Sequence, residues 1–208
     1  TVEGTNVGSA TNVTFTNGVS NSNAATLIAY KAETTAVDVS DGSINSTGNA
    51  SYDLDLTVNP AGLNDFTVIP STTSPTTDDS FTVVLTARDQ YQNTKTDYDG
   101  AKSVTWTWAS GGSNSPAGNA AQKPANGNQT FTSGVTGSIS GFKLVKTESA
   151  TITATADTKS GTSSTITAGA GALNDFTLTT QNSQTETAGS SFSGTATGRD
   201  AEQNTKTN

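Results

Sequence analysis

Three aspartates in ARDQYQNTKTDYDG, at residues 87–100, are the residues best suited to binding a metal ion. Asp89, Asp97 and Asp99 offer hard oxygen ligands, which favour Ca²⁺ over Mg²⁺. Their spacing is not that of an EF-hand, and in the second copy of the phrase Asn208 stands where Asp97 stands in the first. Aspartates at the end of a strand commonly accept hydrogen bonds from turn amides. Turn formation is therefore the favoured interpretation, and a calcium site at these three residues is the alternative.

Two tryptophans, Trp106 and Trp108, are two positions apart in SVTWTWA. Alternate residues of a strand project to the same face, so the two indoles could form a platform on which a sugar ring stacks. The favoured interpretation is a core tryptophan with a second one at the margin of the core, because tryptophan commonly anchors β-sandwiches.

Catalytic side chains are scarce in this chain. It has no Cys and no His, which excludes disulfides, thiolate chemistry, most zinc sites and the commonest general base. Paired carboxylates, as glycosidases use, are the remaining catalytic option. The acidic residues fall in turns and on outward strand positions, so we predict a protein that is not an enzyme and requires no cofactor, with calcium as its one candidate ion.

Possible partners are limited by charge and hydropathy. A net charge of −8 and a pI near 4.3 predict repulsion from phosphate backbones, so we expect no nucleic acid partner. No segment approaches the roughly 18 apolar residues that span a bilayer, so we expect no membrane insertion within this segment. Four N-x-S/T sequons allow glycans in a secreted setting, although such sequences also arise by chance in a chain rich in Ser, Thr and Asn. They begin at Asn12, Asn45, Asn49 and Asn128.

An internal repeat organises the chain. The sequence AGLNDFTV at residues 61–68 returns as GALNDFTL at 171–178, and QNTKT at 92–96 returns at 203–207. Two weaker pairs relate FTNGV to FTSGV and YKAETTAVDV to VKTESATITA. The positions of these repeated sequences predict three segments: the C-terminal part of one domain at 1–61, a complete domain at 62–171, and the N-terminal part of a further domain at 172–208. We expect the two partial segments to complete a domain together, within a longer chain or between neighbouring subunits.

Alternating apolar residues predict β-strands in the complete repeat. Phe81, Val83, Leu85 and Ala87 share one face of their strand, and Tyr52, Leu54, Leu56 and Val58 show the same alternation in the first segment. Seven strands are expected, near residues 63–69, 80–88, 102–109, 128–133, 139–146, 150–157 and 162–169. Only 31% of the residues are hydrophobic, but the alternation argues against disorder.

The predicted fold class is all-β, with tandem immunoglobulin-like β-sandwich domains. No segment has the apolar spacing of a helix, and Thr, Ser, Gly and Asn disfavour helix interiors. Turns are predicted at pairs such as Asn17-Gly18, whose residues tolerate positive φ. Seven short strands at this spacing are typical of an immunoglobulin-like sandwich.

A family resemblance appears in the phrases D-Q-Y-Q-N and D-A-E-Q-N after a strand, in GFKLVKTESATITATAD, and in AGLNDF at the start of a repeat. Together they resemble the tandem bacterial immunoglobulin-like domains of large surface proteins, including the invasin-like and adhesin-stalk groups. Such domains often carry Gly, with positive φ, before the Asn, where this chain has Gln92 and Gln203. The resemblance covers essentially the whole chain and implies an extracellular, cell-surface protein.

These observations lead to two functional hypotheses besides the disfavoured enzyme. The first is a structural repeat protein of an extracellular surface assembly, namely a stalk, a surface layer or a filament, whose partners are adjoining repeats or neighbouring copies of itself. The second is an adhesin or carbohydrate-binding module that uses Trp106 and Trp108 to bind surface glycans.

Overall fold

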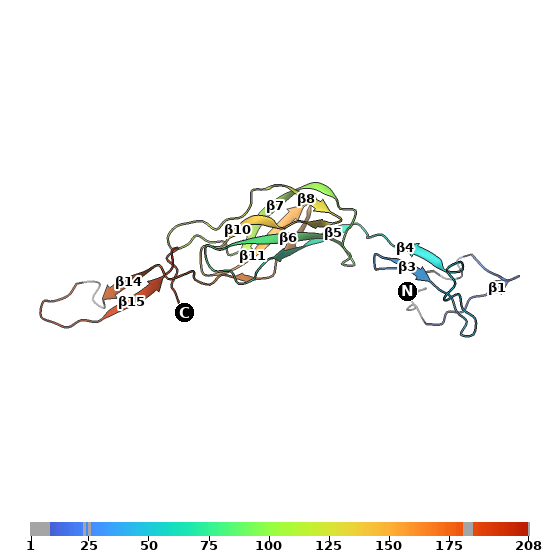
Figure 1. Cartoon of the computed structure of the whole chain (residues 1–208), viewed down its shortest axis with the longest axis horizontal. Coiled ribbons are helices and arrows are strands. Elements are labelled where there is room, and N and C mark those ends of the chain that lie inside the picture. Colours follow the sequence, from blue (N-terminus) through green and yellow to red (C-terminus); the bar gives the residue numbers. More distant parts are fainter. Residues whose placement is uncertain (1–8, 23, 25, 181–184, 208) are drawn as a thin grey trace. The chain divides into compact units, whose positions relative to one another are not determined.

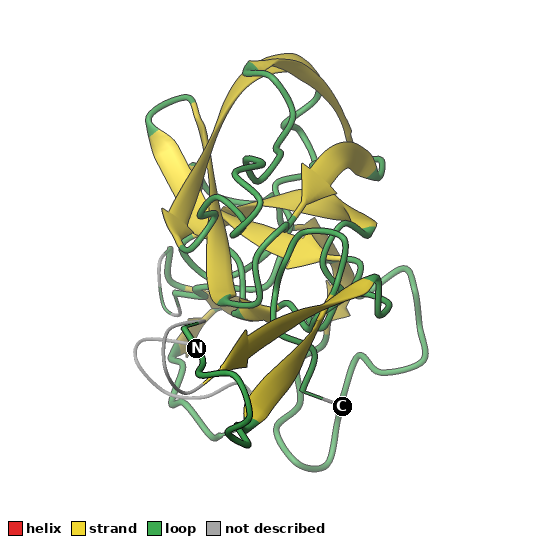
Figure 2. Cartoon of the chain, turned by 90° about the vertical axis from the view of Figure 1, so that its left-hand side faces the viewer, coloured by secondary structure: helices red, strands yellow, loops and turns green. Residues whose placement is uncertain are grey.

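The computed structural model describes residues 9–22, 24, 26–180 and 185–207. These residues form strands, turns and loops but no helix, as the strand and loop colours of Figure 2 show. The chain is therefore all-β, as predicted. Its contacts divide it into two compact units: unit 1 comprises Thr1–Ala61 with Tyr91–Asn93, and unit 2 comprises Gly62–Gln90 with Thr94–Asn208.

Most of unit 2 is one β-sandwich (Figure 1). Its nine strands are β5 (Leu63–Pro70), β6 (Ser80–Asp89), β7 (Gly100–Ser110), β8 (Gly127–Thr132), β9 (Val135–Thr136), β10 (Ile139–Lys143), β11 (Ser149–Ala156), β12 (Lys159–Thr162) and β13 (Ile166–Thr167). In one layer, β6 pairs with β5 and β10, all antiparallel. In the other, β7 pairs with β8 and β11, and β11 pairs with β12. This is the strand arrangement of an immunoglobulin-like sandwich.

The core lies between the two layers. Phe81, Val83, Leu85 and Ala87 of β6 are all buried, as their alternation predicted. Other strands contribute aromatic and aliphatic side chains that fill the space between the layers, because each strand turns every second residue inward. Among these strand residues are Phe66, Trp106, Phe131, Phe142, Ile152 and Ile166, and Leu144 joins the core from just after β10.

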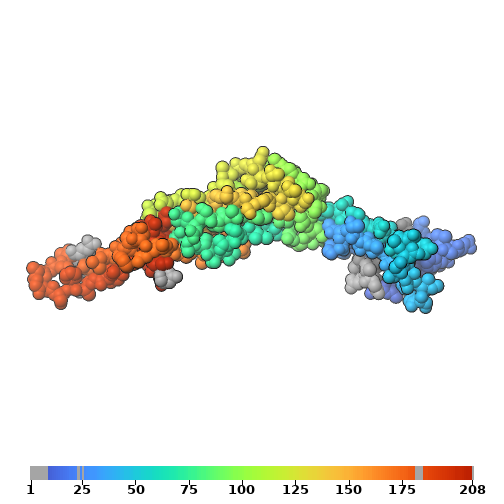
Figure 3. All heavy atoms as spheres, in the orientation of Figure 1, coloured from blue at the N-terminus to red at the C-terminus, as the bar shows by residue number. Residues whose placement is uncertain are grey.

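The predicted strands match the observed ones closely, with two differences. The two-residue strand β9 was missed, because it is too short to show alternation; it pairs with both β6 and β8 and so links the two layers. The last predicted strand, 162–169, contains β13 and only the final residue of β12, so most of β12 was also missed; both short strands pair with β11. The turn-rich segment between β7 and β8, in yellow-green to yellow in Figure 3, is mostly exposed.

A second hairpin of unit 2 follows the sandwich in sequence and is much less covered. Strands β14 (Asp175–Thr180) and β15 (Gly194–Arg199) pair antiparallel. Phe176 and Leu178 are 66% and 68% exposed, whereas their counterparts in the repeat, Phe66 and Val68, are each 4% exposed in the sandwich. No strand of a second layer, among the described residues, covers these side chains of β14.

The described residues of unit 1 contain two small hairpins. Strands β1 (Phe15–Thr16) and β2 (Val19–Ser20) pair, as do β3 (Thr34–Val37) and β4 (Leu54–Thr57). The half-buried face predicted here from alternation is wrong for Tyr52 and Leu54, which are exposed, because alternation alone does not supply a second layer to cover them.

The hairpin turns of the two units share their backbone conformation. Asn17 and Gly18, which join β1 to β2, have φ values of 51° and 81°. Ser133 and Gly134, which join β8 to β9, have φ values of 47° and 82°. Two consecutive residues with positive φ characterise a type I′ hairpin turn. The sequence match between FTNGV and FTSGV therefore corresponds to a match in local structure.

The open edges of the two layers meet at a glycine. A Cβ placed on Gly161 of β12 would lie 1.8 Å from the main-chain oxygen of Phe66 on β5. Only a residue without a side chain allows the two strands to approach this closely.

We predict that Gly161→Ala lowers the free energy of unfolding of the full chain by at least about 2 kcal/mol, because β5 and β12 must separate to admit a methyl group. Urea denaturation measures the change. Gly137→Ala is the control, because a Cβ at Gly137 meets nothing within 4 Å. Equal stability of the two variants would contradict this close packing.

Candidate interaction site around Asp200

The three predicted calcium ligands are not brought together. Asp97 forms an ion pair with Lys95, with Nζ to Oδ1 at 2.6 Å, and Asp99 accepts a hydrogen bond from the Ser133 amide. Asp89, the last residue of β6, is fully buried. Throughout the part of the chain that the structure describes, no group of three or more His, Cys, Asp or Glu side chains is placed to hold a metal ion.

The two tryptophans do share a face of β7, but that face is the inner one. Trp106 is 1% exposed, and its ring meets Phe142 edge-on with centroids 5.1 Å apart. Trp108 is half-buried at the margin of the core, where a Cβ on Gly112 would lie 2.2 Å from its Cγ. The platform of two stacked indoles is therefore wrong for Trp106, and the interpretation as a core tryptophan with a marginal one describes the structure.

The four predicted glycosylation positions all lie at the surface. Asn12, Asn45, Asn49 and Asn128 are exposed, and their modification stays a prediction.

The most organised polar site lies in the loop that follows β15, at residues 200–204. Asp200 is 1% exposed, and each of its carboxylate oxygens has its own donors. Oδ2 accepts hydrogen bonds from the Thr77 hydroxyl at 2.6 Å and from the Gly171 amide at 3.0 Å. Oδ1 accepts from the amides of Glu202 at 3.0 Å and Asn204 at 2.8 Å. This carboxylate thus fixes its own turn and holds that turn against residues far away in sequence.

Asn204 extends the contact to the segment between β10 and β11. Its Oδ1 accepts a hydrogen bond from the Thr147 amide at 3.0 Å, and its Nδ2 donates one to the Val145 carbonyl at 2.9 Å. The side chain is only 2% exposed. Both halves of the side-chain amide are therefore paired with main-chain groups of the sandwich.

Glu202 makes a third contact, with the loop between β7 and β8. Its carboxylate accepts hydrogen bonds from Asn119 Nδ2 at 2.9 and 3.1 Å, and its main-chain oxygen accepts one from the Ala117 amide at 3.1 Å. Glu202 is 8% exposed. The loop is thus held at three separate places on the sandwich.

The turn itself has an unusual backbone. The family resemblance implies a glycine with positive φ before the Asn, and Gln92 and Gln203 adopt that conformation with φ values of 67° and 63°. A non-glycine residue in this region is strained by about 1–2 kcal/mol. The Gln203 side chain donates to Asp175 Oδ2 at 2.8 Å, which helps to hold the turn.

A cavity of about 370 Å³ opens beside this loop, lined by residues 76–79, 171–174 and 200–202. Its remaining carboxylates have partners: Asp78 pairs with Lys143 at 2.9 Å, and Asp79 accepts a hydrogen bond from the Thr76 hydroxyl. Each described carboxylate of the lining thus accepts a hydrogen bond or forms an ion pair.

The pKa of Asp200 is set by opposing effects. Burial raises the pKa, but hydrogen bonds from Thr77, the Gly171 amide and Asn204 together hold it below its usual range. The carboxylate is therefore ionised at neutral pH, and its charge contributes to the stability of the folded state.

Sequence reasoning located the repeated phrase and its turn, but it did not identify Asp200, Glu202 and Asn204 as contact residues. Their partners lie 57 to 123 positions earlier, at Thr77, Asn119, Val145 and Thr147, and no local pattern indicates them. The repetition of D-x-x-Q-N was the one available signal.

The described part of the chain contains no helix of the length and apolarity needed to cross a bilayer.

Comparisons with known proteins found few similar chains. No family model and no curated protein matches this chain. Among solved structures, FdeC, described as a broadly conserved Escherichia coli adhesin, is similar with 18% sequence identity and a TM-score of 0.42. The similarity covers 76% of this chain and 48% of that chain, so this chain spans about half the length of FdeC in that structure.

We predict that Asp200→Asn destabilises the full chain at pH 7, because an amide nitrogen cannot accept hydrogen bonds from Thr77 and Gly171. We also expect the stability of Asp200→Asn to fall less on acidification than the stability of the original chain. A lowered folded-state pKa gives stability that is present above the unfolded pKa of about 3.9 and is lost as the pH falls through the folded value. Urea denaturation of both proteins between pH 7 and pH 2.5 measures the difference. Parallel pH profiles would contradict this role of Asp200.

Proposed function

We propose that this chain belongs to a structural repeat protein of an extracellular surface assembly, such as a stalk, a surface layer or a filament. The observation that carries the proposal is the loop at residues 200–204. In the repeat organisation, this loop belongs to the segment after the sandwich, yet its polar side chains are buried against the sandwich. A joint of this kind positions one repeat on the previous one.

Burial distinguishes this loop from a flexible tether. Asp200, Glu202 and Asn204 are each less than 10% exposed, and all their side chains have hydrogen-bond partners. Buried polar groups with satisfied partners favour a single geometry, because any other arrangement leaves a group unpaired at a cost of about 1–3 kcal/mol. Such a joint resists bending and suits a protein that holds a position in space.

A role without catalysis is supported by the chemistry of the site. The chain has no Cys or His, and the carboxylates that line the cavity beside Asp200 are engaged by lysine, hydroxyl and amide donors. These are the groups of a structural contact.

Adjoining repeats or further copies of the chain are the proposed partners. Exposed apolar residues on β14 and β4, including Phe176, Leu178 and Leu54, support association with another β-element, because large apolar side chains rarely gather on a surface without a partner. The resemblance to bacterial surface domains supports an extracellular location, and the exposed sequons are compatible with it.

The second candidate, an adhesin or carbohydrate-binding module, now depends on Trp108 alone. Trp108 is partly accessible at the edge of the core, whereas Trp106 is buried. A single half-buried indole offers a smaller stacking surface than the predicted pair.

Electron microscopy of the native material tests the structural function. We expect surface appendages, layers or filaments that antibodies against this chain label on intact cells, because an array of rigidly joined repeats is extended and external. Label confined to the cell interior, or to isolated globular particles, would refute the proposal.

A glycan array tests the alternative. We expect the full chain and Trp108→Ala to give the same signal, because the structural function needs no sugar ligand. Specific glycan binding that is abolished by Trp108→Ala would instead favour the carbohydrate-binding module.

A further inference from the structure

The loops that carry D-x-x-Q-N in the two repeats have the same local structure. Gln92 and Gln203 share a positive φ, as described above. The Lys95 amide donates to the Ala87 carbonyl at 2.9 Å, and the Lys206 amide donates to the Gly198 carbonyl at 2.9 Å. This main-chain hydrogen bond therefore returns 111 residues later, as does the isolated β-bridge, which joins Arg88 to Thr94 in the first loop and Arg199 to Thr205 in the second. The two loops are thus structural equivalents.

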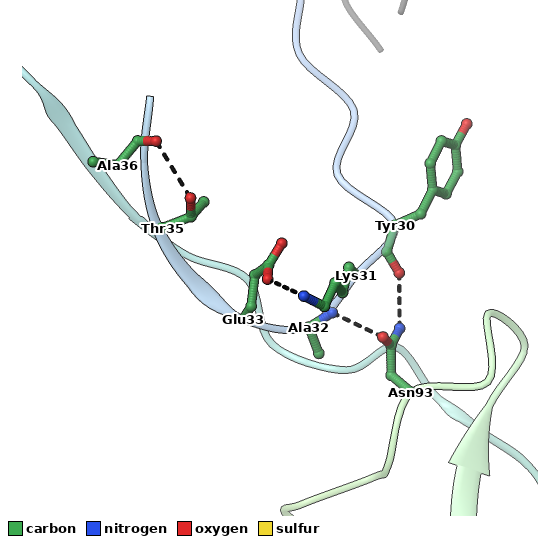
Figure 4. Close-up of polar contacts among 7 residues, drawn as sticks. All are labelled: Tyr30, Lys31, Ala32, Glu33, Thr35, Ala36 and Asn93. Carbon is green, nitrogen blue, oxygen red and sulfur yellow. Dashed lines mark hydrogen bonds and ion pairs between the residues drawn. The ribbon is translucent and has the colours of Figure 1, made fainter. Parts of the chain in front are cut away.

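Asn93 of the first loop belongs by its contacts to unit 1, where it pairs with the segment before β3 (Figure 4). Its Oδ1 accepts a hydrogen bond from the Ala32 amide at 2.9 Å, and its Nδ2 donates one to the Tyr30 carbonyl at 2.8 Å. This is the pattern that Asn204 forms with Thr147 and Val145 before β11.

The two segments that the asparagines bind, residues 30–32 and 145–147, are called the accepting segments below, and they are also equivalent to each other. Tyr30 and Val145 are 115 positions apart, as are Ala32 and Thr147, and this is the offset that relates YKAETTAVDV to VKTESATITA. Asn93 and Asn204 therefore use the same two side-chain atoms to contact equivalent main-chain groups in two successive repeats. We call this pair of hydrogen bonds the asparagine clasp.

The asparagine clasp recognises the main chain and not the side chains of its partner. A side-chain amide carries one acceptor and one donor group in the arrangement of a peptide unit, so it can pair with an N–H and a C=O two residues apart. The partner side chains differ between the repeats, Tyr and Ala in one and Val and Thr in the other. The clasp therefore tolerates divergence in the accepting segment.

A second position in the loop makes contacts that differ between the repeats. Tyr91 and Glu202 occupy the same place, two residues before the Asn. The Tyr91 ring meets the Tyr30 ring edge-on with centroids 5.0 Å apart, whereas the Glu202 carboxylate binds Asn119. Each contact requires a particular partner side chain.

We propose that the D-x-x-Q-N loop is a two-part connector that binds the preceding immunoglobulin-like repeat. Asn93 or Asn204 forms a clasp that any repeat with this backbone can accept, and Tyr91 or Glu202 selects the repeat that is accepted. The partner is the segment that precedes β11 in the sandwich, residues 145–147, or β3 in unit 1, residues 30–32. This inference deepens the proposed structural function and rests on it for its role in an array.

Amide hydrogen exchange, measured by NMR on the full chain, tests the clasp directly. We expect Asn204→Ala to speed exchange of the Thr147 amide about tenfold, as the loss of two hydrogen bonds implies, without affecting the Ala32 amide. Asn93→Ala should have the reverse effect. Unchanged exchange at the paired amide, or equal acceleration of all amides in either variant, would overturn the clasp.

Reciprocal substitutions at the accepting segment provide matched controls. Ala32→Thr and Thr147→Ala exchange the side chains of the two repeats and keep both N–H groups. Recognition of the main chain predicts exchange rates at these amides within about twofold of the original, because neither hydrogen bond is removed. An acceleration as large as that in Asn204→Ala would show that the clasp recognises side chains.

A double-mutant cycle tests the selecting position. Glu202→Ala and Asn119→Ala should each accelerate exchange of the Ala117 amide about threefold, and the double variant should show no more than either single change, because both remove one contact. Independent, multiplying effects would refute the selecting role of Glu202.

The connector and the structural function can fail separately. If the exchange experiments succeed while microscopy finds no array, the structural function fails and the connector stands. If microscopy finds an array while the exchange experiments fail, the connector alone fails.

Discussion

A buried carboxylate must be surrounded by donors, and that requirement shapes the end of this sandwich. Asp200 is shielded from water. Its donors are a hydroxyl and an amide from the sandwich and two amides from its own turn. Moving the loop away from the sandwich would remove the donors of Oδ2 that Thr77 and Gly171 provide, and a charged carboxylate that loses donors in a poorly solvated place is costly. The conformation of the loop and its position on the sandwich are therefore determined together. The contacts of Glu202 and Asn204 depend on this arrangement.

A joint made of polar contacts suits a chain with few large apolar side chains. The hydrophobic core is confined to the narrow space between two layers, where strict alternation in β6 and close approach at Gly161 allow 31% hydrophobic residues to suffice. The contacts that hold the loop at residues 200–204 on the sandwich are polar. Directional hydrogen bonds to the main chain supply that attachment and fix its geometry more narrowly than apolar contact would.

The sequence was informative wherever structure follows from local pattern. Alternation predicted the buried face of β6, and the pair Asn17-Gly18 predicted the turn between β1 and β2. The exposure of Leu54 could not be predicted, because a strand's pattern shows which side is apolar but not whether a second layer covers it. Trp106 and Trp108 were correctly placed on one face, but burial decided between a platform and a core. The role of Asn204 depends on Thr147, 57 positions away, and long-range pairs of this kind leave no local pattern.

The central claim is that the loop at residues 200–204 is fixed to the sandwich as firmly as the sandwich is to itself. Backbone ¹⁵N relaxation of the full chain measures this most directly, by comparing the order parameters of residues 200–204 with those of β6. We expect order parameters of about 0.85 in both segments, as in rigid backbone. Order parameters below about 0.6 in the loop, beside rigid values in β6, would show a flexible tether and contradict it.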